Sequence, residues 1–139
     1  MADCIFCKIL KGEIAAQKVY EDEKSVAILD INPVAPGHAL VMPRGHFETF
    51  SDLPPDVLSA LSQAAQAVAR GVMKATGSPG FNLLMNNHRC SGQAIAHAHY
   101  HVIPRKPDDG VKYNWPAKAY PQPGDSEKVA GEIRKALGK

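Results

Sequence analysis

The stretch GQAIAHAHYHVIPR, residues 92–105, holds three of the six histidines of the chain at alternate positions. Successive side chains of a β-strand point to opposite faces, so an extended conformation would place His97, His99 and His101 on one face. The apolar and aromatic residues between them would then face a hydrophobic core. We therefore expect a central strand over 94–104. We also expect the histidines to form a site, because burying three imidazoles without partners is costly.

The segments around this stretch predict a sheet and one long helix. Residues 51–77 carry apolar side chains every three to four positions, with prolines near the start and Gly77 at the end, which is typical of a helix. Shorter helices are expected at the two ends of the chain. These elements favour an α+β fold, with a five-stranded, mainly antiparallel sheet packed on the long helix. The other strands are expected at 16–23, 25–31, 38–43 and 80–87.

Length and composition narrow the function classes. The 139 residues, 45% of them hydrophobic, predict a single domain over 1–139, in which 105–139 form a C-terminal extension of irregular chain and a helix. A net charge of +2 without long runs of like charge argues against nucleic-acid and membrane-surface binding. We find no signal peptide and no stretch long enough to span a membrane. Three cysteines suit a reducing compartment, so we expect a cytoplasmic protein.

The histidine row leaves two kinds of site open. Alternate histidines on a strand can bind one zinc ion. Alternatively, one neutral imidazole can attack phosphorus while its neighbours bind phosphate oxygens and transfer protons. Gly92, Asn86 and Gln93 favour the second, since a glycine loop and amide donors suit an oxyanion. His38, after the sequence APG, is a further candidate for this pocket. The acidic cluster of a two-metal enzyme is absent from the sequence.

The run HAHYHVI, residues 97–103, resembles the signature of the histidine triad superfamily of nucleotide hydrolases and transferases. The segments DCIFCKILKGEI and AILDINPVAPGHALVMPRGH are similar to the same superfamily in order and spacing, over about residues 3–106. The resemblance implies cleavage at the α-phosphate of a purine nucleotide conjugate, through a covalent nucleotidyl-histidine. The conjugate would be a dinucleoside polyphosphate or a nucleoside phosphoramidate, and AMP is the expected product. No metal would be required for this chemistry itself.

The resemblance also implies a role for each matching residue. His99, the middle histidine, would be the nucleophile, and the main-chain carbonyl of His97 would fix its tautomer. His101 and His38 would contact the phosphate and assist proton transfer. The remaining expected substrate contacts are Asn86, Gly92 and Gln93 at the α-phosphate, Asp30 at the ribose hydroxyls, and Phe6, Ile9 and Ile31 as walls of the base pocket.

The pair Cys4 and Cys7 has three interpretations from the residues alone. It can be a redox pair, half of a zinc site, or two free thiols in a small helix. The redox interpretation is disfavoured, because no strand precedes the pair. Superfamily members with this N-terminal pair resemble the chain, and the resemblance implies a structural zinc on Cys4, Cys7, His46 and His97.

Four positions lie outside this assignment. Ala94 departs from the superfamily pattern, in which Ser or Thr follows the loop glutamine and contacts the leaving group, so the leaving group stays open. The sequence IPR after the triad resembles bacterial members. Arg105 and Lys106 could then meet a longer phosphate chain, although we favour solvated charges. Trp115 is expected to be a core anchor, with a cover over the substrate as the alternative.

The resemblance implies a two-fold homodimer that packs through the long helices and the edge strands. Two other functions remain open. The chain could be a nucleotide-binding module with little catalysis, or a metalloenzyme in which all three triad histidines bind a metal. A structural or adaptor protein is the least expected.

Overall fold

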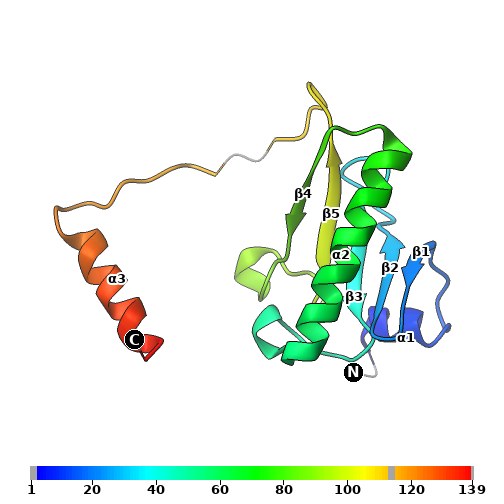
Figure 1. Cartoon of the computed structure of the whole chain (residues 1–139), viewed down its shortest axis with the longest axis horizontal. Helices are drawn as coiled ribbons and strands as arrows, with labels where there is room; N and C mark the ends of the chain where they lie inside the picture. The colour runs from blue at the N-terminus through cyan, green and yellow to red at the C-terminus, as the bar shows by residue number, and fades with distance from the viewer. Residues whose placement is uncertain (1–2, 113–114, 139) are drawn as a thin grey trace.

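The computed structural model describes residues 3–112 and 115–138. Within them, five strands form one antiparallel sheet in the order β1-β2-β3-β5-β4 (Figure 1). The strands are β1 (Lys18–Glu21), β2 (Ser25–Leu29), β3 (Ala39–Pro43), β4 (Gly80–Leu84) and β5 (Tyr100–Arg105). The α-helices are α1 (Ile5–Leu10), α2 (Pro55–Thr76) and α3 (Asp125–Ala136), and short 3₁₀ turns cover Phe50–Asp52 and Arg89–Ser91. The predicted α+β fold is therefore confirmed.

Helix α2 covers one face of the sheet (Figure 1). Its apolar stripe packs on β2, β3 and β5, because the small residues Ala64, Ala65 and Ala69 let the helix approach while Leu61 and Val68 fill the gaps. Gly77 ends the helix in the left-handed conformation, with φ of 65°, as the sequence predicted. The start differs from the prediction, since Phe50–Asp52 form a separate turn and α2 begins only at Pro55.

The opposite face of the sheet is covered by α1. Phe6 and Ile9 are buried there against apolar side chains of β2 and β3, so both central strands are buried on both faces. A helix of six residues is not stable alone in water. Its position therefore depends on these two side chains and on whatever holds Cys4 and Cys7 at its start.

The predicted strand over 94–104 is wrong in its first half. β5 begins at Tyr100, because the N–H of His97 donates to the carbonyl of Ile95 in a tight bend, 2.8 Å, and the N–H of Ala98 donates outside the sheet to Phe47, 2.7 Å. The alternation of faces nevertheless survives. Ala98 lies in the core under α2, whereas the rings of His97 and His99 contact Phe6 of α1. The predicted strand over 80–87 is also shorter and ends at Leu84.

After β5 the chain leaves the sheet, and α3 stands apart from it (Figure 1). Trp115 lies in this segment and is 84% exposed, so the expectation that it anchors the core is wrong. The chain here runs past the body instead of folding into it. No helix of the described residues is long and apolar enough to cross a membrane.

Candidate active site

A cavity of about 410 Å³ opens between α1 and the ends of β2 and β5. Its floor is apolar and its polar groups gather at one end. Among the residues that line it are eight of those predicted from the sequence: Phe6, Ile9, Asp30, Ile31, Asn86, Gly92, His99 and His101. Two predicted residues, His38 and Gln93, lie behind this lining.

The main chain decides the tautomer of His99. Its Nδ1 lies 2.7 Å from the carbonyl oxygen of His97, and a carbonyl can only accept, so Nδ1 carries the proton and donates. The other nitrogen, Nε2, is left with a bare lone pair. Burial lowers the pKa of His99 below its usual value, which keeps the ring neutral at pH 7. The ring is therefore prepared as a nucleophile.

A second chain of hydrogen bonds runs through His38 to His101. The N–H of Val34 donates to Nδ1 of His38, 3.1 Å, so the proton of a neutral His38 must lie on Nε2. That Nε2–H donates to Nδ1 of His101, 2.9 Å away. The Nε2 of His101 must then carry a proton of its own. Burial lowers the pKa of His101 to about 4, and it also lowers the pKa of His38.

The two chains place complementary groups next to each other. The rings of His99 and His101 are 4.9 Å apart, so a bare nitrogen that can attack lies beside an N–H that can donate to an oxyanion. His38 is buried and bonds to His101, so it can position that ring, and its expected contact with phosphate stays a prediction.

The same bonds argue against a metal on the triad. Asp30, His38 and His101 lie close enough to hold an ion, but Nε2 of His38 carries a hydrogen because its Nδ1 already accepts from Val34. His97 and His99 do not converge on a common point either, since His99 turns its Nδ1 to a carbonyl. The geometry contradicts the hypothesis of a metalloenzyme with three triad ligands.

A different cluster fits a metal. Cys4, Cys7, His46 and His97 present four ligand atoms that all lie within 4.8 Å of one another. Nε2 of the fully buried His97 donates to the carbonyl of Pro43, 2.9 Å, so its Nδ1 is a bare lone pair. That Nδ1 lies 3.5 Å from Sγ of Cys4 and 3.7 Å from Sγ of Cys7. Sγ of Cys7 and Nδ1 of His46 are 3.3 Å apart. Two thiols and two imidazoles match a closed tetrahedral zinc site.

A loop with a 3₁₀ turn shapes the polar end of the cavity. Gly92 adopts φ of 101°, which favours glycine, and a Cβ there would lie 3.6 Å from the amide nitrogen of Asn86. Gln93 was expected to contact phosphate, which stays a prediction, and its side-chain amide has two partners within the fold. It accepts from the N–H of His88 and donates to the carbonyl of Glu48, both at 2.6 Å. Gln93 therefore holds the loop in place.

The residues expected to contact the ribose and the base all line this cavity. Asp30 lines the cavity directly after β2, where one carboxylate oxygen accepts from the N–H of Asn32, 2.9 Å, and the other lies 3.6 Å from Nε2 of His38. Phe6 and Ile9 are buried walls. Ile31 is 87% exposed, so it forms the rim of the cavity and not an inner wall.

Ala94 lies between this cavity and a neighbouring pocket lined by Glu48, His88, Arg89 and Gln93. Its methyl group supplies neither a donor nor an acceptor. The sequence showed the missing hydroxyl, but only the structure shows that the position separates two spaces.

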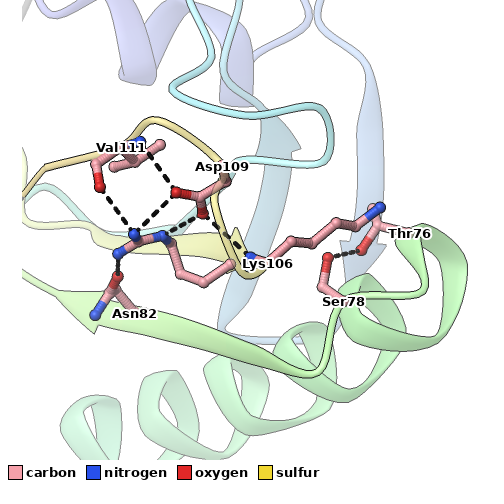
Figure 2. Close-up of polar contacts among 7 residues, drawn as sticks. Thr76, Ser78, Asn82, Lys106, Asp109 and Val111 are labelled. Atoms are coloured by element: carbon pink, nitrogen blue, oxygen red, sulfur yellow. Dashed lines mark hydrogen bonds and ion pairs between the residues drawn. The ribbon is translucent and has the colours of Figure 1, made fainter.

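Arg105 does not behave as expected from the sequence. Its guanidinium group is enclosed by polar partners, of which Figure 2 labels Asn82, Asp109 and Val111. It donates to both carboxylate oxygens of Asp109 at 2.7 and 3.1 Å, to the side chain of Asn82 at 2.7 Å and to the carbonyl of Val111 at 3.0 Å. The pair holds the pKa of the Asp109 carboxyl well below its usual range. Arg105 is thus neither a solvated charge nor a lining residue of the cavity with the triad.

The groups missed from the sequence are mostly main-chain atoms. Three of them fix the tautomer or the position of a side chain in the site: the carbonyl of Pro43, the N–H of Val34 and the carbonyl of Glu48. Such groups carry no residue-specific signal. Asp109 did carry one, because it follows Arg105 by four positions.

The comparisons with known proteins agree with this geometry. The family model described as the HIT domain matches residues 11–108 of the chain. Adenylylsulfatase HINT3 of Arabidopsis thaliana is 46% identical over 107 residues, which are 77% of this chain, and the chain spans about half (54%) of that relative's length. Adenosine 5′-monophosphoramidase HNT1 of Saccharomyces cerevisiae is 38% identical over 137 residues, covering 98% of this chain and 81% of that protein.

Two solved structures are similar as well. A protein from Streptococcus mutans superposes with a TM-score of 0.92 at 35% identity, over 99% of this chain and 87% of that chain. A Zn-bound histidine triad family protein from Mycobacterium smegmatis superposes with a TM-score of 0.76 at 29% identity, over 99% of each chain.

Proposed function

The chain belongs to the HIT domain family, and on that premise we propose that it hydrolyses a purine nucleotide conjugate at the α-phosphate through a covalent intermediate on His99. The observation that carries the proposal is the pair of ring nitrogens in the cavity. Nε2 of His99 is bare and buried, and the ring of His101 beside it offers an N–H. The curated relatives named above, a sulfatase and a phosphoramidase of adenylyl compounds, support the same class of reaction.

The first step is the attack of His99 on phosphorus. A bond forms between Nε2 and the α-phosphorus, and the bond from phosphorus to the leaving group breaks, with the electron pair going to the leaving group. The carbonyl of His97 stabilises the positive charge that the ring acquires, because it accepts the hydrogen bond from Nδ1. The Nε2–H of His101 donates to a phosphate oxygen, and His38 holds that ring in the required tautomer.

The second step restores the histidine. Water attacks the phosphorus of the nucleotidyl-histidine and releases one proton to the solvent, the P–N bond breaks, and the electron pair returns to Nε2 of His99. The mononucleotide leaves. Asn86 and the loop at Gly92 lie at the polar end of the cavity, where they would hold the α-phosphate in both steps.

The rest of the nucleotide has a matching surface. The apolar floor, with Phe6 and Ile9, suits a planar purine, and the carboxylate of Asp30 suits the ribose hydroxyls as an acceptor. With adenine as the base the product is AMP.

The leaving group passes the methyl group of Ala94. An amine must take up a proton to leave, whereas a sulfate or a polyphosphate leaves as a stable anion. Because Ala94 offers no hydroxyl, anionic leaving groups such as the polyphosphate of a dinucleoside polyphosphate fit this chain better than the amine of a phosphoramidate.

A structural zinc on Cys4, Cys7, His46 and His97 belongs to the same proposal. It would tie α1 to the loop after β3 and to the first triad histidine, and the reaction itself would need no metal. The protein would work as a cytoplasmic homodimer, without nucleic acid or membrane. The exposed Phe81 and Leu83 on the edge strand β4 support a second copy at that edge.

The test is AMP release from three substrates in parallel: adenosine 5′-phosphoramidate, adenosine 5′-phosphosulfate and diadenosine tetraphosphate. The His99→Ala variant should lose at least about a thousandfold in rate with unchanged zinc content, because only the nucleophile is removed. The Cys90→Ser variant is the matched control, since Cys90 is exposed in the same loop and lines neither pocket. Denatured wild-type protein quenched during turnover should carry one nucleotidyl group by mass spectrometry.

The competing function is a nucleotide-binding module. It would bind AMP with equal affinity in the wild type and the His99→Ala variant and release none from any substrate. The intact nucleophile geometry argues against this outcome.

A further inference from the structure

Helix α3 has an apolar stripe that its own chain leaves uncovered. Val129, Ile133 and Leu137 repeat every four residues and are 37%, 54% and 68% exposed. Among the described residues, no helix or strand packs extensively on α3 (Figure 1). An isolated helix of 12 residues is marginal in water, and helices of this length are usually stabilised by packing their apolar face. The stripe therefore needs a surface from outside the chain.

Contacts among residues 105–111 set the direction in which the chain leaves β5 toward α3. We call residues 107–138 the arm. Arg105 clamps Asp109 and the carbonyl of Val111, and the N–H of Lys106 donates to Asp109, 3.1 Å (Figure 2). Asp108 and Gly110 both take positive φ, 56° and 75°. This clamped turn directs the arm across the β4 side of the sheet (Figure 1).

The same course occurs in the Streptococcus mutans structure. The arm is about a quarter of the chain. A TM-score of 0.92 over 99% of the chain cannot be reached unless most of the arm superposes together with the body. The extended arm is thus a shared feature and not a peculiarity of this chain.

An apolar groove of about 450 Å³ lies between α2 and β1 at the opposite edge of the sheet. We call it the α2–β1 groove. On α2 it is lined by Ala67, Gly71 and Ala75, four residues apart, and on β1 by Val19, which is 49% exposed. Small residues at this spacing let another helix approach closely. The groove is therefore shaped for an apolar helix, and the arm of the same chain leaves on the other side.

We propose that the arm docks on a second copy of this chain and that the stripe of α3 fills the α2–β1 groove of that copy. The proposal rests on the homodimer proposed above. If two copies meet at their β4 edges, the partner lies on the side to which the arm leaves, and its groove lies at its far edge. The residues between Lys106 and α3 can span about 60 Å when extended, which exceeds the roughly 35 Å width of a domain of this size. The arm is long enough to cross the partner and deliver α3 there.

Cross-linking tests the contact directly. One chain carries Gly71→Cys, where a Cβ meets no atom within 4 Å, and a longer tagged chain carries Ile133→Cys. Both also carry Cys90→Ser, because Cys90 is the exposed native thiol. Co-expressed, zinc-loaded protein is treated with a short bismaleimide. We expect a cross-linked product that contains both chains.

Gln66→Cys in place of Gly71→Cys is the matched control, since position 66 is exposed on α2 but outside the groove, and it should give little product. A single chain with both Gly71→Cys and Ile133→Cys that cross-links only as a monomer would show the arm folding back, and would overturn the proposal. A protein that is dimeric and releases AMP, yet gives no 71–133 product, would overturn the arm exchange and leave the proposed function standing.

A second variant does not depend on thiols. Ile133→Asp should raise the dimer dissociation constant by at least about tenfold, measured by light scattering over a dilution series, because a charge would enter an apolar groove. Lys135→Asp on the polar side of α3 is the matched control. Equal dissociation constants for Ile133→Asp and the wild type would contradict the proposal.

Discussion

For single side chains, the hydrogen-bond partners decide which chemistry each histidine can do. Five of the six histidines lie in or next to the two clusters, yet they are prepared for different tasks. His97 presents Nδ1 to two thiols because Pro43 takes its Nε2–H, whereas His99 presents Nε2 to the cavity because a carbonyl takes its Nδ1–H. The residue type supplies the imidazole, and the main chain selects the nitrogen.

The pH profile of the reaction follows from the burial of these rings. In the proposed mechanism His99 attacks with a bare lone pair, so activity would require its neutral form. Burial lowers the pKa of His99, so the ring takes up a proton only below its usual pKa near 6.5. We expect kcat/KM for AMP release to stay level from pH 8 to about 6.5 and to fall in more acidic buffer. A profile that already falls between pH 8 and 7 would contradict the neutral nucleophile.

The leaving-group preference depends on Ala94. Ala94→Ser adds a hydroxyl at the boundary between the two pockets, where it can donate to a departing amine. We expect kcat for adenosine 5′-phosphoramidate to rise about tenfold relative to kcat for diadenosine tetraphosphate. Ala96→Ser is the control. Ala96 does not line the cavity with the triad, but lines the neighbouring pocket and a pocket beside Cys4 and His46. An unchanged ratio in Ala94→Ser would exclude a hydroxyl effect at this position.

At the scale of helices and strands, one wall of the candidate active site is formed by α1. This helix supplies Phe6 and Ile9 to the cavity but has only six residues, so it cannot hold its position through its own hydrogen bonds. Two apolar side chains and the thiols at its start do that. The cavity and the cluster of Cys4, Cys7, His46 and His97 are therefore mechanically linked through one short element.

Loss of the metal should loosen this element. Cys7→Ser removes one ligand of the cluster, and we expect zinc content near zero and a free energy of unfolding lower by on the order of 3 kcal/mol. KM for the nucleotide should rise more than kcat falls, because the pocket wall moves while the nucleophile remains. Cys90→Ser, at an exposed cysteine, should change stability by less than about 0.5 kcal/mol. Wild-type stability in metal-free Cys7→Ser would show that the cluster holds no structural ion.

At the scale of the whole molecule, the two faces of the sheet differ in what they bury. The face under α2 is a continuous apolar core, and the face under α1 carries buried imidazoles beside the second apolar cluster. Stability and chemistry are thus coupled through the buried histidines, which the fold must keep neutral.

This coupling makes the protein sensitive to acid. Burial lowers the pKa of His101 to about 4, while in the unfolded chain that ring binds a proton near 6.5. Between these values the unfolded state holds more protons, so the free energy of unfolding should fall as the pH drops from 6.5 toward 4 and stay level above 6.5. Urea unfolding at pH 7.5, 6 and 5 measures this. His101→Asn should flatten the dependence, and His88→Ala, at an exposed site, should leave it unchanged.

Much of this molecule could be predicted from local patterns. The 3.6-residue period and Gly77 identified α2, and the resemblance carried by HAHYHV led to the antiparallel fold and to the residues that line the cavity. The predicted ligands of the zinc site also come together, although they lie 90 positions apart in the sequence. The helix follows from residue spacing, whereas the cavity lining and the ligand set were implied by the resemblance to the histidine triad superfamily.

Other features arise only when distant segments meet. The bend before β5 exists because Ala98 bonds to Phe47, and the roles of His38, Gln93 and Arg105 follow from partners that the chain brings to them: His101, the carbonyl of Glu48, and Asp109. A hydrogen bond depends on tenths of an ångström between groups from separate elements. The residues and their alternation therefore indicate the proposed chemistry, and packing decides which ring nitrogen is bare, which side chains have partners within the fold, and where the arm leaves the body.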